Sequence, residues 1–139
     1  MTQENVEVVR RVTGVMDAEG FEAAVPVFLE AAHPDVEWQE DPAWPGSASY
    51  RGIEQVRAVI LDRMGTLEFD QETEDLIGVD DKVVVLVRWV GRGKASGAQG
   101  ELSMAMIWTL RDEAITRVEF FLDRARALEA AGLPRSSSA

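Results

Sequence analysis

The sequence predicts an α+β domain in which three N-terminal helices cover a strongly curved antiparallel sheet and a short helix follows the sheet. Apolar residues recur at helical spacing up to residue 65, and the pattern changes to strand-like alternation over residues 67–122. The 139 residues match the usual size of one domain. We therefore expect a single domain over residues 1–133 and a flexible tail over residues 134–139.

Three helices are predicted in the first half of the chain. The apolar face of the first helix consists of Val6, Val9, Val12 and Met16. Gly20 ends this helix, and a second helix covers residues 22–32, just before Pro34. The third helix begins after Gly52 and ends at Gly65. Its apolar face consists of Ile53, Val56, Ile60 and Met64.

Five strands and a last helix complete the prediction. A short strand at residues 36–39 precedes a long loop rich in proline, glycine, serine and aromatic residues, which is typical of a site wall. Four longer strands follow, separated by short turns, at residues 67–77, 82–94, 99–111 and 114–122. The last helix covers residues 124–131, with Asp123 as its N-cap and Gly132 at its end.

The turn at residues 79–81 sets the register of the first hairpin and so predicts which of its two faces is exposed to solvent. Closing this turn pairs Glu72 with Arg88 and Glu68 with Arg92. Each pair places a negative side chain opposite a positive one on the same face of the hairpin. That face is expected to be solvated. The opposite face then forms the concave interior of the sheet.

The second hairpin extends this interior face. A turn at residues 96–97 places Trp89 opposite Met104. The large side chains expected on the interior face of the three strands are Phe69, Trp89, Met104, Met106 and Trp108. Aromatic and methionine side chains of this kind favour a pocket for a flat hydrophobic molecule, and the alternative is that they fill the core.

The last strand has two possible registers. One places Glu119 and Phe121 inside, and the other places Val118 and Phe120 there. In the first register Glu119 is a second catalytic acid, because two carboxyl groups in one apolar pocket have separated pKa values. In the second register it is an exposed glutamate beside Arg117.

Composition excludes several classes of partner and site. Lysine and arginine total 14 against 25 aspartates and glutamates, and the resulting net charge of −11 disfavours nucleic acid and anionic membranes. Cysteine is absent and histidine occurs once, so we expect no metal and no cofactor. The N-terminus lacks a signal-peptide pattern and no apolar run is long enough to span a membrane, so a cytoplasmic location is expected.

Four short sequence segments resemble a known protein family. They are residues 33–38, 50–52, 92–97 and 122–133. Together with the order of elements they resemble the SnoaL-like and ketosteroid-isomerase-like branch of the NTF2-like superfamily, over about residues 4–133. The resemblance implies a cone of helices and curved sheet around an apolar pocket. It does not imply one reaction, because the superfamily holds isomerases, polyketide cyclases, dehydratases, hydrolases and non-catalytic binders.

Asp41 is the first candidate catalytic residue. The stretch at residues 36–42, followed by residues 51–52, is similar to the part of ketosteroid isomerase whose Glu-Asp-Pro supplies the proton-shuttling aspartate. A carboxylate at the mouth of an apolar pocket suits proton abstraction next to a carbonyl, because partial loss of water raises its pKa. The alternative is a loop acid that precedes Pro42.

Ketosteroid isomerisation itself is not expected. That enzyme stabilises its oxyanion with a tyrosine and a protonated aspartate. An ungapped alignment places Val12 and Met106 at these positions, and neither side chain donates a hydrogen bond. Loss of one such donor costs about 10²–10³ in rate in other enzymes.

Other ligand contacts are expected from the loop and its neighbours. His33 lies before the strand that leads to Asp41, and Tyr50 and Trp44 lie on the long loop. His33 alternatively satisfies a helix end, and Tyr50 alternatively anchors the loop. The expected apolar lining consists of Trp38, Trp44, Phe69, Trp89, Met104, Met106, Trp108 and Phe121.

These observations predict acid/base chemistry on a small hydrophobic molecule that carries a carbonyl or resembles a polyketide, with Asp41 as the base. The alternative is a module of the same fold that binds a small molecule, or oligomerises, without turnover. The outer face of the sheet carries Val84, Leu86 and Val90, which favours a homodimer through the sheet.

Overall fold

The computed structural model describes residues 2–93 and 99–134, without the side chains of residues 66–69, 92 and 99. The predicted turn at residues 96–97 and most of the predicted tail lie outside the described residues. The helices are α1 (Thr2–Glu19), α2 (Phe21–Ala31), α3 (Ile53–Thr66) and α4 (Arg124–Ala130). The strands are β1 (Ala32–Gln39), β2 (Ser49–Arg51), β3 (Leu67–Val79), β4 (Lys82–Gly93), β5 (Gln99–Arg111) and β6 (Ala114–Phe121).

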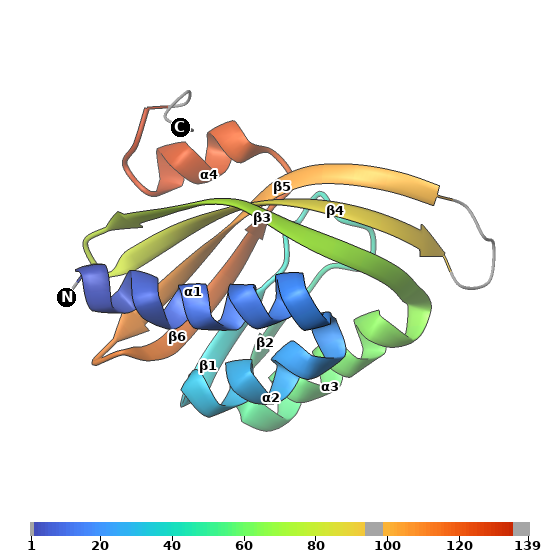
Figure 1. The fold of residues 1–139 in the computed structure, drawn as a ribbon, viewed down its shortest axis with the longest axis horizontal. Helices are drawn as coiled ribbons and strands as arrows, with labels where there is room; N and C mark the ends of the chain where they lie inside the picture. The colour runs from blue at the N-terminus through green and yellow to red at the C-terminus, as the bar shows by residue number, and fades with distance from the viewer. Residues whose placement is uncertain (1, 94–98, 135–139) are drawn as a thin grey trace.

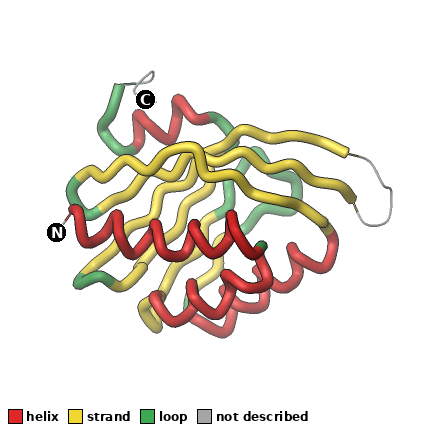
Figure 2. The backbone as a smooth tube through the Cα atoms, in the orientation of Figure 1, coloured by secondary structure: helices red, strands yellow, loops and turns green. Residues whose placement is uncertain are grey.

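The strands form one curved sheet, and α1, α2 and α3 cover its concave side (Figure 1). The order across the sheet is β2-β1-β6-β5-β4-β3. The predicted α+β architecture is confirmed, with two corrections. A sixth strand, β2, lies within the predicted long loop and pairs with β1, and β1 runs parallel to β6, so the sheet is mixed. Parallel neighbours need a long connection, and most of the chain separates these two strands. The tube in Figure 2 shows the same layers, with helices below the sheet and one short helix above it.

The first hairpin has the predicted strand pairing at Glu72 and Arg88, although its register begins differently at the turn. Val79 pairs with Lys82, one residue away from the expected register. An irregularity between Thr73 and Asp75 restores the register, so Glu72 still lies opposite Arg88 and their side chains are 2.9 Å apart. The interior face of β3 and β4 is therefore as predicted.

The register of the second hairpin is shifted by two residues from the predicted one. Trp89 pairs with Leu102 and Met104 pairs with Val87, so the expected pairing of Trp89 with Met104 is wrong. Because side chains alternate along a strand, a shift by two residues keeps each one on its face. Trp89, Met104, Met106 and Trp108 are all part of the interior core cluster.

The α4 helix covers part of the convex face of the sheet (Figure 1). Asp123 caps this helix as predicted, accepting a hydrogen bond from the Ala125 N–H at 2.9 Å. Beneath the helix, Val84 and Leu86 are no more than 2% exposed, whereas Val90 is 48% exposed. Two of the three residues that suggested a dimer are thus covered within one chain.

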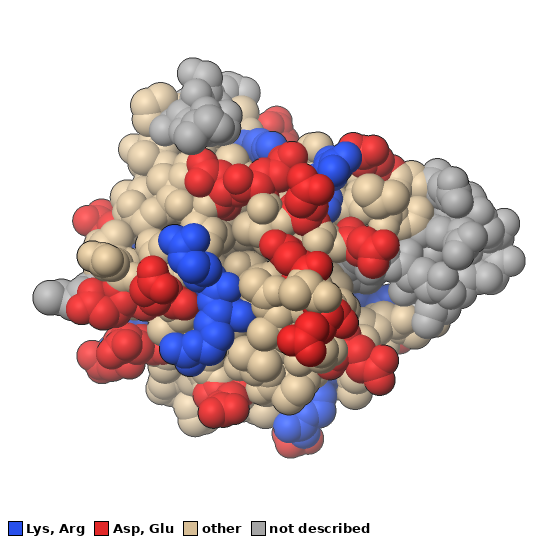
Figure 3. All heavy atoms as spheres, in the orientation of Figure 1, with Lys and Arg blue, Asp and Glu red and all other residues tan. Residues whose placement is uncertain are grey.

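The α1 helix packs tightly against β3. A Cβ atom on Gly78 would lie 2.6 Å from Cγ2 of Thr2 and 2.8 Å from Cγ2 of Val6, so only glycine permits this approach. The exposed surface in Figure 3 carries many acidic side chains, as the composition requires. No helix in the described part of the chain is long and apolar enough to cross a membrane.

Candidate functional site

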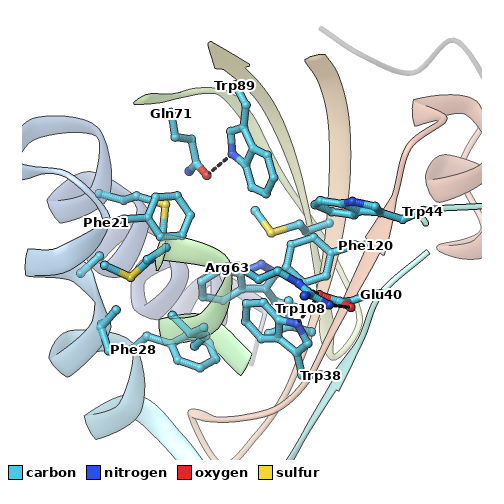
Figure 4. Close-up of a pocket in the computed structure, with 17 residues that line it drawn as sticks. Phe21, Phe28, Trp38, Glu40, Trp44, Arg63, Gln71, Trp89, Trp108 and Phe120 are labelled. Atoms are coloured by element: carbon cyan, nitrogen blue, oxygen red, sulfur yellow. Dashed lines mark hydrogen bonds and ion pairs between the residues drawn. The ribbon is translucent and has the colours of Figure 1, made fainter. Parts of the chain in front are cut away.

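An apolar cavity of about 60 Å³ lies between the helices and the concave face of the sheet. All four tryptophans of the chain and three of its five phenylalanines line this cavity. They come from every layer that meets there: α2, β1, the loop after β1, β4, β5 and β6. The aromatic lining residues are Phe21, Phe28, Trp38, Trp44, Trp89, Trp108 and Phe120 (Figure 4).

The aromatic rings hold one another in fixed orientations. Phe28 meets Trp108 edge to face, with ring centroids 5.6 Å apart and planes at 87°. Trp44, on the loop after β1, contacts Trp89 of β4 in a similar way at 6.2 Å. Edge contacts of this kind add to the stability that burial provides. The loop therefore closes one side of the cavity with a ring that the sheet supports.

Glu40 and Arg63 are the charged side chains of the cavity wall among the described residues. Glu40 follows β1 directly and its side chain is 3% exposed, while Arg63 comes from α3 and is 28% exposed. Arg63 binds both carboxylate oxygens, with Nε 2.9 Å from Oε2 and Nη2 2.5 Å from Oε1. Such a two-point contact is the strongest geometry for this pair of groups.

Two further donors complete the surroundings of Glu40. The Ala48 N–H donates to Oε1 at 3.3 Å, and the Trp38 indole N–H donates to Oε2 at 3.4 Å. Burial raises the pKa of Glu40, but the hydrogen bonds and charge of Arg63 outweigh burial and lower the pKa below its ordinary value. The carboxylate is therefore ionised at neutral pH. It also joins both ends of the loop that carries Trp44.

A second polar set connects the cavity wall to α1. The Trp89 indole N–H donates to Oε1 of Gln71 at 2.7 Å, and the Gln71 amide donates to the Thr73 hydroxyl at 3.2 Å. That hydroxyl donates in turn to Asp17 at 3.0 Å. This chain of hydrogen bonds fixes the direction of the Gln71 amide and the orientation of the Trp89 ring. Figure 4 shows its first bond, between Trp89 and Gln71.

The structure contradicts the expected placement of Asp41. This residue is not among those that line the cavity, although it is only 2% exposed. Its Oδ1 accepts the Ala43 N–H at 2.9 Å, its Oδ2 accepts the Leu122 N–H at 2.8 Å, and Arg126 lies 3.8 Å from Oδ2. Asp41 thus ties the loop after β1 to the segment between β6 and α4.

The pKa of Asp41 also differs from the expectation. Burial alone raises this pKa, but the two backbone hydrogen bonds and the charge of Arg126 outweigh burial, and the pKa is lowered. A carboxylate whose lone pairs are occupied and whose pKa is lowered is a weak proton acceptor. Asp41 therefore lies outside the cavity wall, and its pKa is lowered where the expectation was a raised one.

The register of β6 decides against Glu119 and Phe121 as pocket residues. Phe120 pairs with Met106 and Val118 with Trp108, and these four side chains line the cavity. Glu119 pairs with Ile107 on the opposite face, and Phe121 packs against the apolar cluster under α4. The two-residue turn at residues 112 and 113, both with positive φ, pairs Arg111 with Ala114. An irregularity between Thr109 and Leu110 then shifts the pairing by one residue, which places Phe120 rather than Glu119 opposite Met106.

The remaining predicted contacts divide into two groups. Trp38, Trp44, Trp89, Met106 and Trp108 line the cavity as expected. His33, Tyr50 and Met104 do not: His33 accepts the Asp35 N–H at 3.0 Å, Tyr50 belongs to β2, and Met104 is buried beside the cavity. The side chain of Phe69 lies outside the described residues. Val12 and Met106 are the residues that align with the oxyanion donors of ketosteroid isomerase. Met106 lines the cavity wall, and Val12 is buried in the core.

The expected ligand contacts did not include the Glu40–Arg63 pair, the Gln71 amide or the helix residues of the wall. These helix residues include Met16, Phe21, Phe28 and Met64. Gln71 does lie on the interior face that the strand alternation predicts for β3, although it was not among the expected ligand contacts. No spacing rule links Glu40 to Arg63, since 23 residues separate them.

Comparisons with known proteins agree with this geometry. The family model of the SnoaL-like domain matches residues 9–118. The chain belongs to the SnoaL-like family. This assignment confirms the resemblance drawn from the sequence, and the family has the NTF2-like fold seen here. No curated protein gives a significant match to this SnoaL-like chain.

Solved structures similar to this SnoaL-like protein include an NTF2-like protein from Burkholderia xenovorans, with 22% identity, a TM-score of 0.73 and coverage of 87% of this chain and 90% of that one. TerC co-crystallized with polyporic acid has 21% identity, a TM-score of 0.73 and coverage of 93% and 98%. A Catenulispora acidiphila protein with a ketosteroid isomerase-like fold, in complex with trimethylamine, has 16% identity, a TM-score of 0.68 and coverage of 92% and 97%. These similarities establish the fold.

The two lowered pKa values predict acid sensitivity. Both groups bind protons less readily when folded, so their contribution to stability is present above the ordinary values of 4.5 for Glu40 and 3.8 for Asp41. This contribution is lost as the pH falls below those values towards the folded pKa values. We expect the urea midpoint to fall more steeply below pH 4.5 in the wild type than in Glu40→Gln. An equal slope in both proteins would contradict the lowered pKa of Glu40.

Proposed function

We propose that this SnoaL-like protein binds a small, flat, mostly apolar molecule in the cavity between its helices and sheet. The observation that carries the proposal is the concentration of aromatic side chains, since all four tryptophans meet at one cavity. A wall of this composition removes apolar surface from water and provides ring faces for stacking. The three methionines of the wall, Met16, Met64 and Met106, are flexible enough to adjust to a ligand.

The titratable groups favour binding over turnover. Asp41 is held by two backbone N–H groups outside the cavity wall, and Glu40 is held by Arg63. Neither carboxylate has the raised pKa that an efficient base needs at neutral pH. Two structural relatives support small-molecule binding in this fold, one with polyporic acid and one with trimethylamine.

The binding proposal is tested with indane, a flat hydrocarbon that has no polar group. We expect saturable quenching of tryptophan fluorescence by indane in the wild type. Val25→Phe places a larger side chain in the wall, and it should weaken binding about tenfold or more because the cavity is small. Leu61→Phe, on the exposed surface of α3, is the matched control and should bind as the wild type does.

Two results would contradict the binding proposal. Absence of saturation in the wild type up to the solubility limit would favour an oligomerisation or scaffold role. Equal binding by wild type and Val25→Phe would place the indane site elsewhere on the protein. Thermal melts of all three proteins show whether a loss of binding reflects unfolding.

Acid/base turnover at the same cavity is the second candidate. It is favoured by one observation, that Glu40 is a carboxylate in the wall of an apolar hollow. The chemistry requires Arg63 to move away, so that Glu40 takes a proton from carbon next to a ligand carbonyl and returns a proton to it. In D2O this cycle exchanges the C2 protons of indan-1-one for deuterium. Exchange that is faster than in buffer and lost in Glu40→Gln would establish turnover.

A further inference from the structure

Trp108 of β5 has an unsatisfied polar atom. The residue is 2% exposed and its ring lines the cavity. Its indole nitrogen Nε1 is buried and has no hydrogen-bond partner among the residues that the structure describes. Buried N–H donors almost always have an acceptor, because a donor removed from water without one destabilises the folded protein. The exception therefore needs an explanation.

The other interior donors around the cavity are satisfied, which makes Trp108 stand out. The Trp89 N–H donates to Gln71 and the Trp38 N–H donates to Glu40. The Gln71 amide and the Arg63 guanidinium also have acceptors. A wall that pairs its other polar groups and leaves one N–H without an acceptor suits a ligand that brings the acceptor itself.

We propose that the Trp108 indole N–H binds a hydrogen-bond acceptor on the ligand and so selects uncharged molecules that carry a carbonyl or ether oxygen. The proposal rests on the proposed function, since it assigns a polar contact within the same cavity. The ring packs edge to face against Phe28 in the wall of the cavity. Trp108 is thus a specificity-determining residue, distinct from its neighbours that contribute apolar surface alone.

The chemistry of the cavity wall and the net charge of the protein both favour an uncharged ligand. A primary or quaternary ammonium group has no acceptor for an indole N–H. A carboxylate has one, but it loses its hydration in an apolar wall where Arg63 is already bound to Glu40. The net charge of −11 also repels anions at long range. A neutral carbonyl or ether oxygen on a flat apolar molecule accepts the hydrogen bond, loses little hydration and is not repelled by the net charge.

The test compares indan-1-one with indane, because the two molecules share one bicyclic frame and differ by a carbonyl oxygen. Trp108→Phe removes the donor and keeps an aromatic ring. We expect Trp108→Phe to weaken indan-1-one binding about threefold to tenfold more than indane binding, the effect of one hydrogen bond. Trp38→Phe is the matched control, because its N–H already donates to Glu40, and it should weaken both probes by the same factor.

Indole N–H signals in a ¹H–¹⁵N spectrum give a direct readout. The chain has four tryptophans, and the signal lost in Trp108→Phe identifies the Trp108 indole. This signal should move downfield with indan-1-one and much less with indane. If both probes bind the wild type and Trp108→Phe affects them equally, the assignment of Trp108 is wrong while the binding function stands. If neither probe binds the wild type, the binding function and the Trp108 proposal both fail.

Discussion

Arg63→Met should destabilise the fold by about 2–4 kcal/mol, because it leaves the buried Glu40 carboxylate without its cation. Removal of one partner from a fully buried pair costs about 3–5 kcal/mol. The expected value is lower because Arg63 is 28% exposed, so that water enters when the guanidinium is removed. The measurement is the free energy of unfolding in urea at pH 7.

The same helix provides a matched control for Arg63→Met. Arg57 pairs with Glu54 at 3.3 Å on the exposed face of α3, and Arg57→Met should cost less than about 1 kcal/mol. The double variant Glu40→Gln, Arg63→Met should recover part of the loss, since no unpaired charge remains. Equal effects of Arg63→Met and Arg57→Met would show that the buried pair contributes no more than a surface pair.

Asp41→Asn should cost about 2–4 kcal/mol of stability and leave indane affinity nearly unchanged. The amide keeps one acceptor oxygen but turns an NH2 group towards either the Leu122 or the Ala43 N–H. Two charge-assisted hydrogen bonds are therefore weakened or lost. The measurements are urea unfolding and indane titration on the same preparation.

Asp123→Asn is the matched control for this change. Asp123 also accepts one backbone N–H, at the start of α4, but it is exposed. Asparagine is as good an N-cap as aspartate, so little stability should be lost. The opposite result would be that the wild type exchanges deuterium into indan-1-one, whereas Asp41→Asn is equally stable and does not. That result would support Asp41 as a catalytic base.

Much of the fold follows from the sequence because the period of apolar residues is a local property. The alternation in β4 and β5 places Trp89, Met106 and Trp108 on one face whatever the turn between the strands. Even the wrong pairing of Trp89 left that face unchanged, since the shift was by two residues. In β6, where the uncertainty was a single residue, the sequence left both faces open.

The site depended on contacts that no local pattern specifies. Glu40 and Asp41 are adjacent in the chain, yet one side chain lies in the cavity wall and the other binds the backbone at Leu122. The family resemblance pointed to Asp41, and the fold presents Glu40 with Arg63 as its partner instead. Likewise, the unsatisfied Trp108 N–H became visible only when every neighbouring acceptor had a position.

The sequence by itself thus determined the order of the helices and of all strands except β2, the interior face of β3 to β5 and the aromatic character of the pocket. Only the tertiary structure decided the parallel pairing of β1 with β6, the register of β6 and the partners of each carboxylate. The physical reason is range. Side-chain periodicity acts between residues a few positions apart, whereas the pKa and orientation of a buried carboxylate depend on donors brought from distant parts of the chain.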